Sequence, residues 1–151
     1  MGKKLAPSPK IKYPTYTDCL RFLFGFLKQH YNFDPIDKLP NYRKEDPHGL
    51  KKILKFCRND NYYSSLSGKA AYIFVGLIEG HYYSNGNKRL ALVITLYFLA
   101  LNGYSIKEQK PRELYNLALF VADKQKNNDM SFDALKKKAE QYFGMRLTNT
   151  G

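Results

Sequence analysis

The fold is decided by the stretch His81-Tyr-Tyr-Ser-Asn-Gly-Asn-Lys-Arg89, which leads directly into Leu90-Ala-Leu-Val-Ile-Thr-Leu-Tyr-Phe-Leu-Ala-Leu101. The second part is apolar almost all round, and this pattern predicts a helix buried on every side. Asn102-Gly103 supplies the signal that ends this helix. We therefore expect a helical core in which a polar, glycine-containing loop opens the most hydrophobic helix.

Helical spacing recurs on both sides of this junction. It predicts one helix from Thr17 to Tyr31, one after Pro47 that stops at Asn59-Asp60-Asn61, one over Ala70 to Ile78 that Gly80 ends, one opened by Pro111 and a last one capped by Ser131. The stretch from Asn32 to Pro47 contains interrupting prolines and no sustained period, so it reads as a long connecting loop. Loops of this length often border a functional site.

The length of 151 residues fits one domain with its own core. We predict an all-α fold, a compact single-domain bundle of about six helices around a buried central helix, with at most a short hairpin around Asn59 to Leu66. Residues 1–14, rich in lysine and proline, are expected to form a mobile basic arm, residues 15–146 the helical domain and residues 147–151 a tail.

The charge of the chain is strongly positive, with 25 Lys and Arg against 13 Asp and Glu and a formal net charge of +12. This predicts attraction to polyanions such as phosphates, nucleic acid or an acidic partner. The start lacks a secretory pattern, and no apolar stretch approaches the roughly 20 residues of a membrane span. A cytoplasmic protein without a membrane partner is expected, and Cys19 and Cys57 are expected to be buried and reduced.

The loop itself has the composition of a phosphate site. Amides at a helix start are unpaired and carry partial positive charge, so Gly86 and Asn87 can cradle a phosphate. Lys88 and Arg89 add full charges, and His81 is a candidate general base. A Walker A loop is excluded because the chain has no Gly-Lys-Ser or Gly-Lys-Thr and a helix, not a strand, precedes the loop.

The nine residues His81 to Arg89 resemble the signature of the Fic/Doc family, His-x-Phe-x-Asp or Glu-Gly or Ala-Asn-Lys or Gly-Arg. The Asn87-Lys88-Arg89 form is most similar to the Doc (death-on-curing) toxin branch of these Fido-domain proteins. The resemblance implies an enzyme that transfers AMP or another nucleoside monophosphate, or in Doc a phosphoryl group, from a nucleotide to a hydroxyl of a target protein.

The same resemblance implies roles for individual residues. His81 would be the catalytic base, and Asn85, Gly86, Asn87, Lys88 and Arg89 would bind ATP or another nucleotide together with Mg²⁺. Asn85 stands where the family has its Mg²⁺-binding carboxylate, and its neutral carbonyl is a weaker ligand. Tyr83 replaces the family phenylalanine with a ring that can still pack. Asn61, Tyr62 and Tyr63 are candidates for a flap that presents the target.

Partners follow from the resemblance as well. The target protein is unidentified, with a translation factor among the candidates, and a separate antitoxin protein is expected because the chain lacks the Ser or Thr-x-x-x-Glu-Gly or Asn segment that similar proteins use to block their own site. Two alternatives stay open: a basic helical nucleic-acid-binding module, and a catalytically weakened relative that only binds nucleotide. The sequence leaves the transferred group and the oligomeric state undecided.

Overall fold

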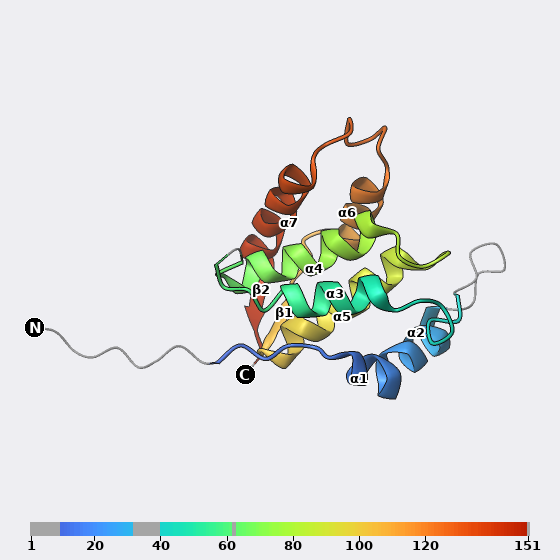
Figure 1. Ribbon diagram of the computed structural model, residues 1–151. Helices are drawn as coiled ribbons and strands as arrows, with labels where there is room; N and C mark the ends of the chain where they lie inside the picture. Colours follow the sequence, from blue (N-terminus) through green and yellow to red (C-terminus); the bar gives the residue numbers. More distant parts are fainter. Residues whose placement is uncertain (1–9, 32–39, 62, 151) are drawn as a thin grey trace, which may run out of the picture.

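Helices make up most of residues 10–31, 40–61 and 63–150, which are the residues that the computed structural model describes (Figure 1). The elements follow one another as α1 (Tyr16–Asp18), the π-helix η1 (Cys19–Leu23), α2 (Phe24–Tyr31), α3 (His48–Phe56), α4 (Leu66–Gly80), α5 (Asn87–Leu101), β1 (Tyr104–Ile106), α6 (Glu113–Ala122), α7 (Phe132–Arg146) and β2 (Leu147–Asn149). The predicted all-α bundle is confirmed.

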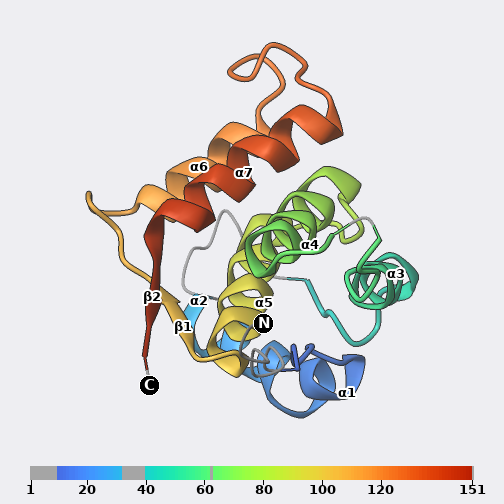
Figure 2. The same ribbon diagram turned by 90° about the vertical axis from the view of Figure 1, so that its left-hand side faces the viewer.

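Helix α4 lies at the centre of the bundle. Its N-cap is Ser65, whose hydroxyl accepts a hydrogen bond from Gly68 N at 2.9 Å. Every residue from Gly68 to Ile78 is buried, and α4 packs against α3, α5, α6 and α7. Figure 2 shows these four helices arranged around it.

Helix α5 packs against α4, α6 and α2, yet it is not buried on every side as predicted. Leu96 is 38% exposed, and Ala100 on the same outer face is also exposed. The physical reason is that α4 takes the central position, so α5 lies in an outer layer where no described element covers this face. Neither α5 nor any other helix in the described ranges is long and apolar enough to cross a membrane.

The two strands are not where the sequence predicted a hairpin. Residues 59–61 form a turn in which Asn59 Oδ1 accepts from Asn61 N at 3.0 Å, and Ser65 already caps α4. The observed sheet pairs β1 with β2 in antiparallel register, Ser105 opposite Thr148. Residues 147–149 were assigned to a tail, but they form β2 because the partly buried Leu147 packs against the core.

The start of the described chain is also held in place. Lys12 N donates to Asn102 Oδ1 and Asn102 Nδ2 donates to Lys12 O, each at 2.9 Å. The Tyr13 ring stacks on Phe98 with centroids 5.9 Å apart. The mobile arm predicted for residues 1–14 is therefore wrong at residues 10–14, where apolar side chains pack on the end of α5. Its first nine positions lie outside the described residues.

Candidate active site

The loop of residues 81–86 joins the end of α4 to the start of α5 and is bounded by two left-handed residues. His81 is the C-cap of α4 with φ 47° and ψ 51°, and Gly86 is the N-cap of α5 with φ 72°. The prediction that Gly80 would end α4 is off by one residue, because Gly80 is still helical and His81 takes the left-handed position. His81 is exposed at this turn.

The side chain of Asn87 shapes the loop from inside. Its Oδ1 accepts a hydrogen bond from Tyr83 N at 3.0 Å, and its Nδ2 donates to Tyr83 O at 2.8 Å. The same Nδ2 lies 3.3 Å from His81 Nδ1. Asn87 is 6% exposed, and its side-chain amide stabilises the conformation of the loop. Its backbone N–H lies in the first turn of α5, where amides have no partner within the helix.

This contact bears on the imidazole of His81. The Tyr83 bonds fix the orientation of the amide, so a hydrogen donor faces Nδ1. In a neutral imidazole an accepting Nδ1 places the ring hydrogen on Nε2. The contact therefore favours the Nε2–H tautomer in the free protein.

Two tyrosines anchor the loop to the bundle. The Tyr82 ring fills the space beside two glycines, because a Cβ built on Gly49 would lie 2.0 Å from Tyr82 Cδ1 and one built on Gly80 would lie 2.2 Å from Tyr82 Cζ. Tyr83 is 2% exposed and meets the Tyr42 ring edge-on with centroids 4.9 Å apart. Its hydroxyl is buried and has no hydrogen-bond partner among the described residues, and burial raises the pKa of Tyr83.

The segment before α3 braces the loop from outside. Tyr42 Oη donates to Gly86 O at 2.8 Å. Glu45 Oε1 accepts from Ser84 N at 2.9 Å, and Glu45 Oε2 accepts from Ser84 Oγ at 2.8 Å. The prediction of a connecting loop is confirmed for residues 40–47, the described part of that stretch, and these residues contact the candidate site. Tyr42 and Glu45 themselves were not predicted, because no local pattern marks a contact across about forty residues.

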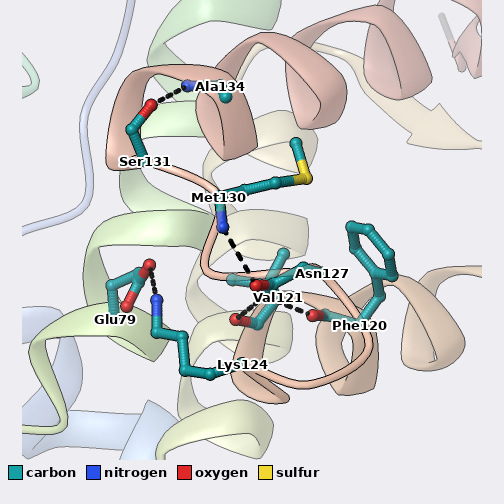
Figure 3. Close-up of polar contacts among 8 residues, drawn as sticks. All are labelled: Glu79, Phe120, Val121, Lys124, Asn127, Met130, Ser131 and Ala134. Atoms are coloured by element: carbon teal, nitrogen blue, oxygen red, sulfur yellow. Dashed lines mark hydrogen bonds and ion pairs between the residues drawn. The ribbon is translucent and has the colours of Figure 1, made fainter.

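Positive charge gathers where α5 begins. Lys88 and Arg89 stand in its first turn, which contains no acidic residue. Beside Lys88 a hollow of about 420 Å³ opens toward the end of α6 and the following loop, with Lys124 and Lys126 in its wall. Figure 3 shows Lys124 forming an ion pair with Glu79 in the last turn of α4.

The wall of this hollow is built on a buried amide. Asn127 Nδ2 donates to Phe120 O at 2.9 Å and to Val121 O at 3.1 Å, while its Oδ1 accepts from Met130 N at 3.2 Å (Figure 3). These bonds satisfy carbonyls at the end of α6 that the helix itself leaves unpaired. The loop after α6 therefore has a defined shape next to the candidate site.

Comparison with known families agrees with this geometry. The model of the Fic/DOC family matches residues 14–99, more than half of the chain, from two residues before α1 into α5. The chain belongs to the Fic/DOC family. No curated protein matches it at a significant level.

The structure unites most of the predicted Fic/DOC site residues. His81, Asn85, Gly86, Asn87, Lys88 and Arg89 all lie in the loop and the first turn of α5. Asn61 and Tyr63 lie elsewhere, before the start of α4, whereas His81 follows the end of that helix. The Tyr63 ring stacks on Tyr72 with centroids 4.2 Å apart, and Tyr62 lies outside the described residues.

The described residues hold no group of three or more His, Cys, Asp and Glu side chains that could bind a metal ion by themselves. Mg²⁺ in nucleotide sites, however, takes only one or two carboxylates plus waters and substrate phosphates. One carboxylate, that of Glu45, is held against the loop by the backbone N–H and hydroxyl of Ser84, the neighbour of Asn85. This donor set fits a magnesium ion that arrives with a nucleotide.

Proposed function

We propose that this Fic/DOC protein transfers a nucleotide-derived group, either a nucleoside monophosphate such as AMP or a phosphoryl group, to a hydroxyl of a target protein. Members of the family are in general transferases that act on proteins. The observation that supports the proposal here is that the exposed His81 opens the loop leading into α5, whose first turn carries Lys88 and Arg89.

In this proposal the nucleotide phosphates bind at the start of α5. The first-turn amides and Lys88 and Arg89 neutralise them, since a helix N-terminus and two cations all favour an anion. Magnesium bound with the nucleotide screens phosphate charge and polarises the transferred group. Cations in the first turn of a helix oppose its dipole, and a bound anion relieves that conflict.

His81 acts on the attacking hydroxyl. The hydroxyl oxygen bonds to the transferred phosphorus, the bond from phosphorus to the leaving pyrophosphate or ADP breaks, and the hydroxyl proton passes to Nε2 of His81. Before this transfer Nε2 must carry a lone pair. The ring hydrogen therefore has to move from Nε2 to Nδ1, and the contact of Nδ1 with Asn87 Nδ2 then loosens. Binding of nucleotide and target is the event that we expect to shift this tautomer.

The test is the mass of new protein adducts. The protein is incubated with ATP, with other nucleoside triphosphates and with a cell extract, and added AMP, UMP or phosphate is distinguished by mass. His81→Ala should lower transfer by about 10²–10⁴ while nucleotide binding stays, because a base is lost and phosphate contacts are not. His30→Ala, an exposed histidine on α2, is the matched control.

A second variant separates binding from chemistry. Arg89→Ala should weaken nucleotide binding in a calorimetric titration, since a bidentate phosphate contact is removed. Transfer that is unchanged in His81→Ala, or nucleotide affinity that is unchanged in Arg89→Ala, contradicts the assigned roles.

Control by a second protein is part of the proposal. An antitoxin would restrain the enzyme in the cytoplasm, and a translation factor is a candidate target. Expression of the chain alone should slow growth, and the product of a neighbouring gene should bind the chain and restore growth. Harmless expression together with the absence of any such binder contradicts this part.

The net charge of +12 favours one other candidate function, a basic nucleic-acid-binding module. Nucleic-acid affinity of that kind falls steeply with salt and leaves no covalent product. Tight, salt-dependent binding with no adduct on any protein would favour this candidate over the transferase.

A further inference from the structure

We propose that Glu45 supplies the carboxylate through which this site binds Mg²⁺, in place of the carboxylate that the motif lacks at Asn85. The inference rests on the proposed nucleotide-dependent function. Between His81 and Arg89 the loop itself contains no Asp or Glu. A magnesium ion at this loop therefore requires a carboxylate from another part of the chain.

Glu45 is brought to the loop by the fold and not by sequence proximity. It lies 39 positions before Ser84 in the chain, and both of its oxygens are bound there, Oε1 by the backbone N–H and Oε2 by the hydroxyl. Ser84 is the immediate neighbour of Asn85. The carboxylate is thus fixed next to the position that carries the metal-binding side chain in the family signature.

The hydrogen bonds leave room for a metal ion. An ionised carboxylate offers about four lone-pair positions, and Ser84 occupies one on each oxygen. Partly buried carboxylates that are already oriented by hydrogen bonds make better ligands than free ones, because no side-chain entropy is lost on binding. Glu45 is partly buried.

The segment that carries Glu45 is also attached to Gly86, at the start of α5, where the nucleotide phosphates are proposed to bind. Tyr42 is 4% exposed, its ring stacks on Phe24 with centroids 5.2 Å apart, and its hydroxyl donates to Gly86 O at 2.8 Å. Glu45 N donates to Asn41 O at 3.2 Å, which closes the turn between them. The carboxylate of Glu45 and the start of α5 are therefore held close together. Such an arrangement would let one magnesium ion bind both this carboxylate and the nucleotide phosphates.

A plain structural brace is the competing role, and one substitution separates the two. In Glu45→Gln the amide oxygen still accepts from Ser84 N, and the amide nitrogen donates to Ser84 Oγ. The brace stays while the charge is lost. Asp46→Asn is the matched control, because it removes the same charge one residue away. It keeps a side-chain oxygen that can accept the hydrogen bond from His48 N.

The experiment measures ATP binding by calorimetry in EDTA and across a magnesium series. For the wild type we expect magnesium to tighten ATP binding, and in Glu45→Gln we expect this enhancement to fall by at least about tenfold while affinity in EDTA is equal or higher. Asp46→Asn should match the wild type. The double variant Glu45→Gln with Asn85→Asp should regain the enhancement, because it returns a carboxylate to the loop.

The outcomes distinguish this inference from the function on which it rests. If ATP binds the wild type and Glu45→Gln keeps the full magnesium enhancement, Glu45 is only a brace and the assignment is overturned. If Glu45→Gln and Asp46→Asn lose the enhancement equally, the loss of one negative charge near the loop explains the effect, whichever residue carried it. The assignment is then again overturned. If the wild type binds no ATP in either buffer, the proposed function fails and the role of Glu45 fails with it.

Discussion

Asn87 shows how one buried amide can organise the loop of the candidate site. It closes the loop through both backbone atoms of Tyr83 and places a donor against His81 Nδ1. The sequence predicted the residue, but as a phosphate ligand. Its side chain shapes the loop, and only the fold could show this, because Asn side chains serve both purposes equally well.

Asn85 is the position at which the motif departs from the family. Asn85→Asp should lower the Mg²⁺ concentration needed for half-maximal transfer and raise the rate, because an anionic oxygen replaces a neutral one at nearly the same volume. The transfer assay is run at fixed nucleotide across a magnesium series, with Asn116→Asp on the exposed face of α6 as control. Superimposable magnesium curves for wild type and Asn85→Asp would mean that this side chain does not face the ion.

Tyr83 carries a buried hydroxyl to which no residue in the described ranges offers a hydrogen bond. Tyr83→Phe should raise the free energy of unfolding, by about 1–3 kcal/mol at most, because the desolvation cost of the hydroxyl disappears while the ring keeps its packing. Thermal and urea unfolding measure the change, and transfer activity should stay. A less stable Phe variant would indicate that the hydroxyl is satisfied in solution, for example by an ordered water.

At the scale of elements, α3 and α4 meet the loop through the Tyr82 ring. Gly49→Ala places a methyl group 2.0 Å from a ring carbon, so we expect the ring to be displaced, with lower thermal stability and slower transfer. Gly25→Ala is the matched control, since a Cβ there meets no atom of the described residues within 4 Å and a helical alanine is favoured by up to about 1 kcal/mol.

A double variant checks the cause. Gly49→Ala combined with Tyr82→Ala should lose no further stability beyond that of Tyr82→Ala, because the clash requires the ring. Additive losses would place the effect of Gly49 somewhere other than in its contact with Tyr82.

The elements divide into those that local sequence predicts and those that it does not. Helical periodicity, Ser65 and Ser131 caps and the Asn102-Gly103 stop are encoded locally, so the helices were predicted with errors of a few residues. The strands β1 and β2 have three residues each and pair across more than forty positions, so neither carries a period of its own. The braces from Tyr42 and Glu45 to the loop are non-local for the same reason.

At the scale of the whole molecule, an ion pair joins α6 to α7 in the C-terminal half. Glu113 at the start of α6 accepts hydrogen bonds from Arg146 at the end of α7. The hydrogen bond from Arg146 lowers the pKa of Glu113 below its ordinary value of 4.5. A lowered carboxylate pKa contributes stability above the unfolded value, and that stability is lost as the pH falls through the folded value.

Glu113→Gln should therefore reduce the thermal midpoint at pH 7 and flatten its decline below about pH 4.5, where the pH begins to fall toward the lowered pKa of the wild-type carboxylate. Circular dichroism melts between pH 3 and pH 7 measure both effects, with Asp133→Asn on the exposed start of α7 as control. Parallel pH profiles for the wild type and Glu113→Gln would exclude this pair as a source of acid sensitivity.

The two ends of the described chain meet at one point, because Lys12 bonds to Asn102 and Thr150 N donates to Gly103 O at 2.8 Å. This point is the far end of α5, roughly 20 Å along the helix from the loop that carries His81. The fold is therefore suited to circular permutation: a short linker can join residue 150 to residue 10, and new termini can open between the exposed Lys110 and Pro111. In such a chain the loop of the candidate site, its braces and α4 keep their order, and only the connection between β1 and α6 is cut.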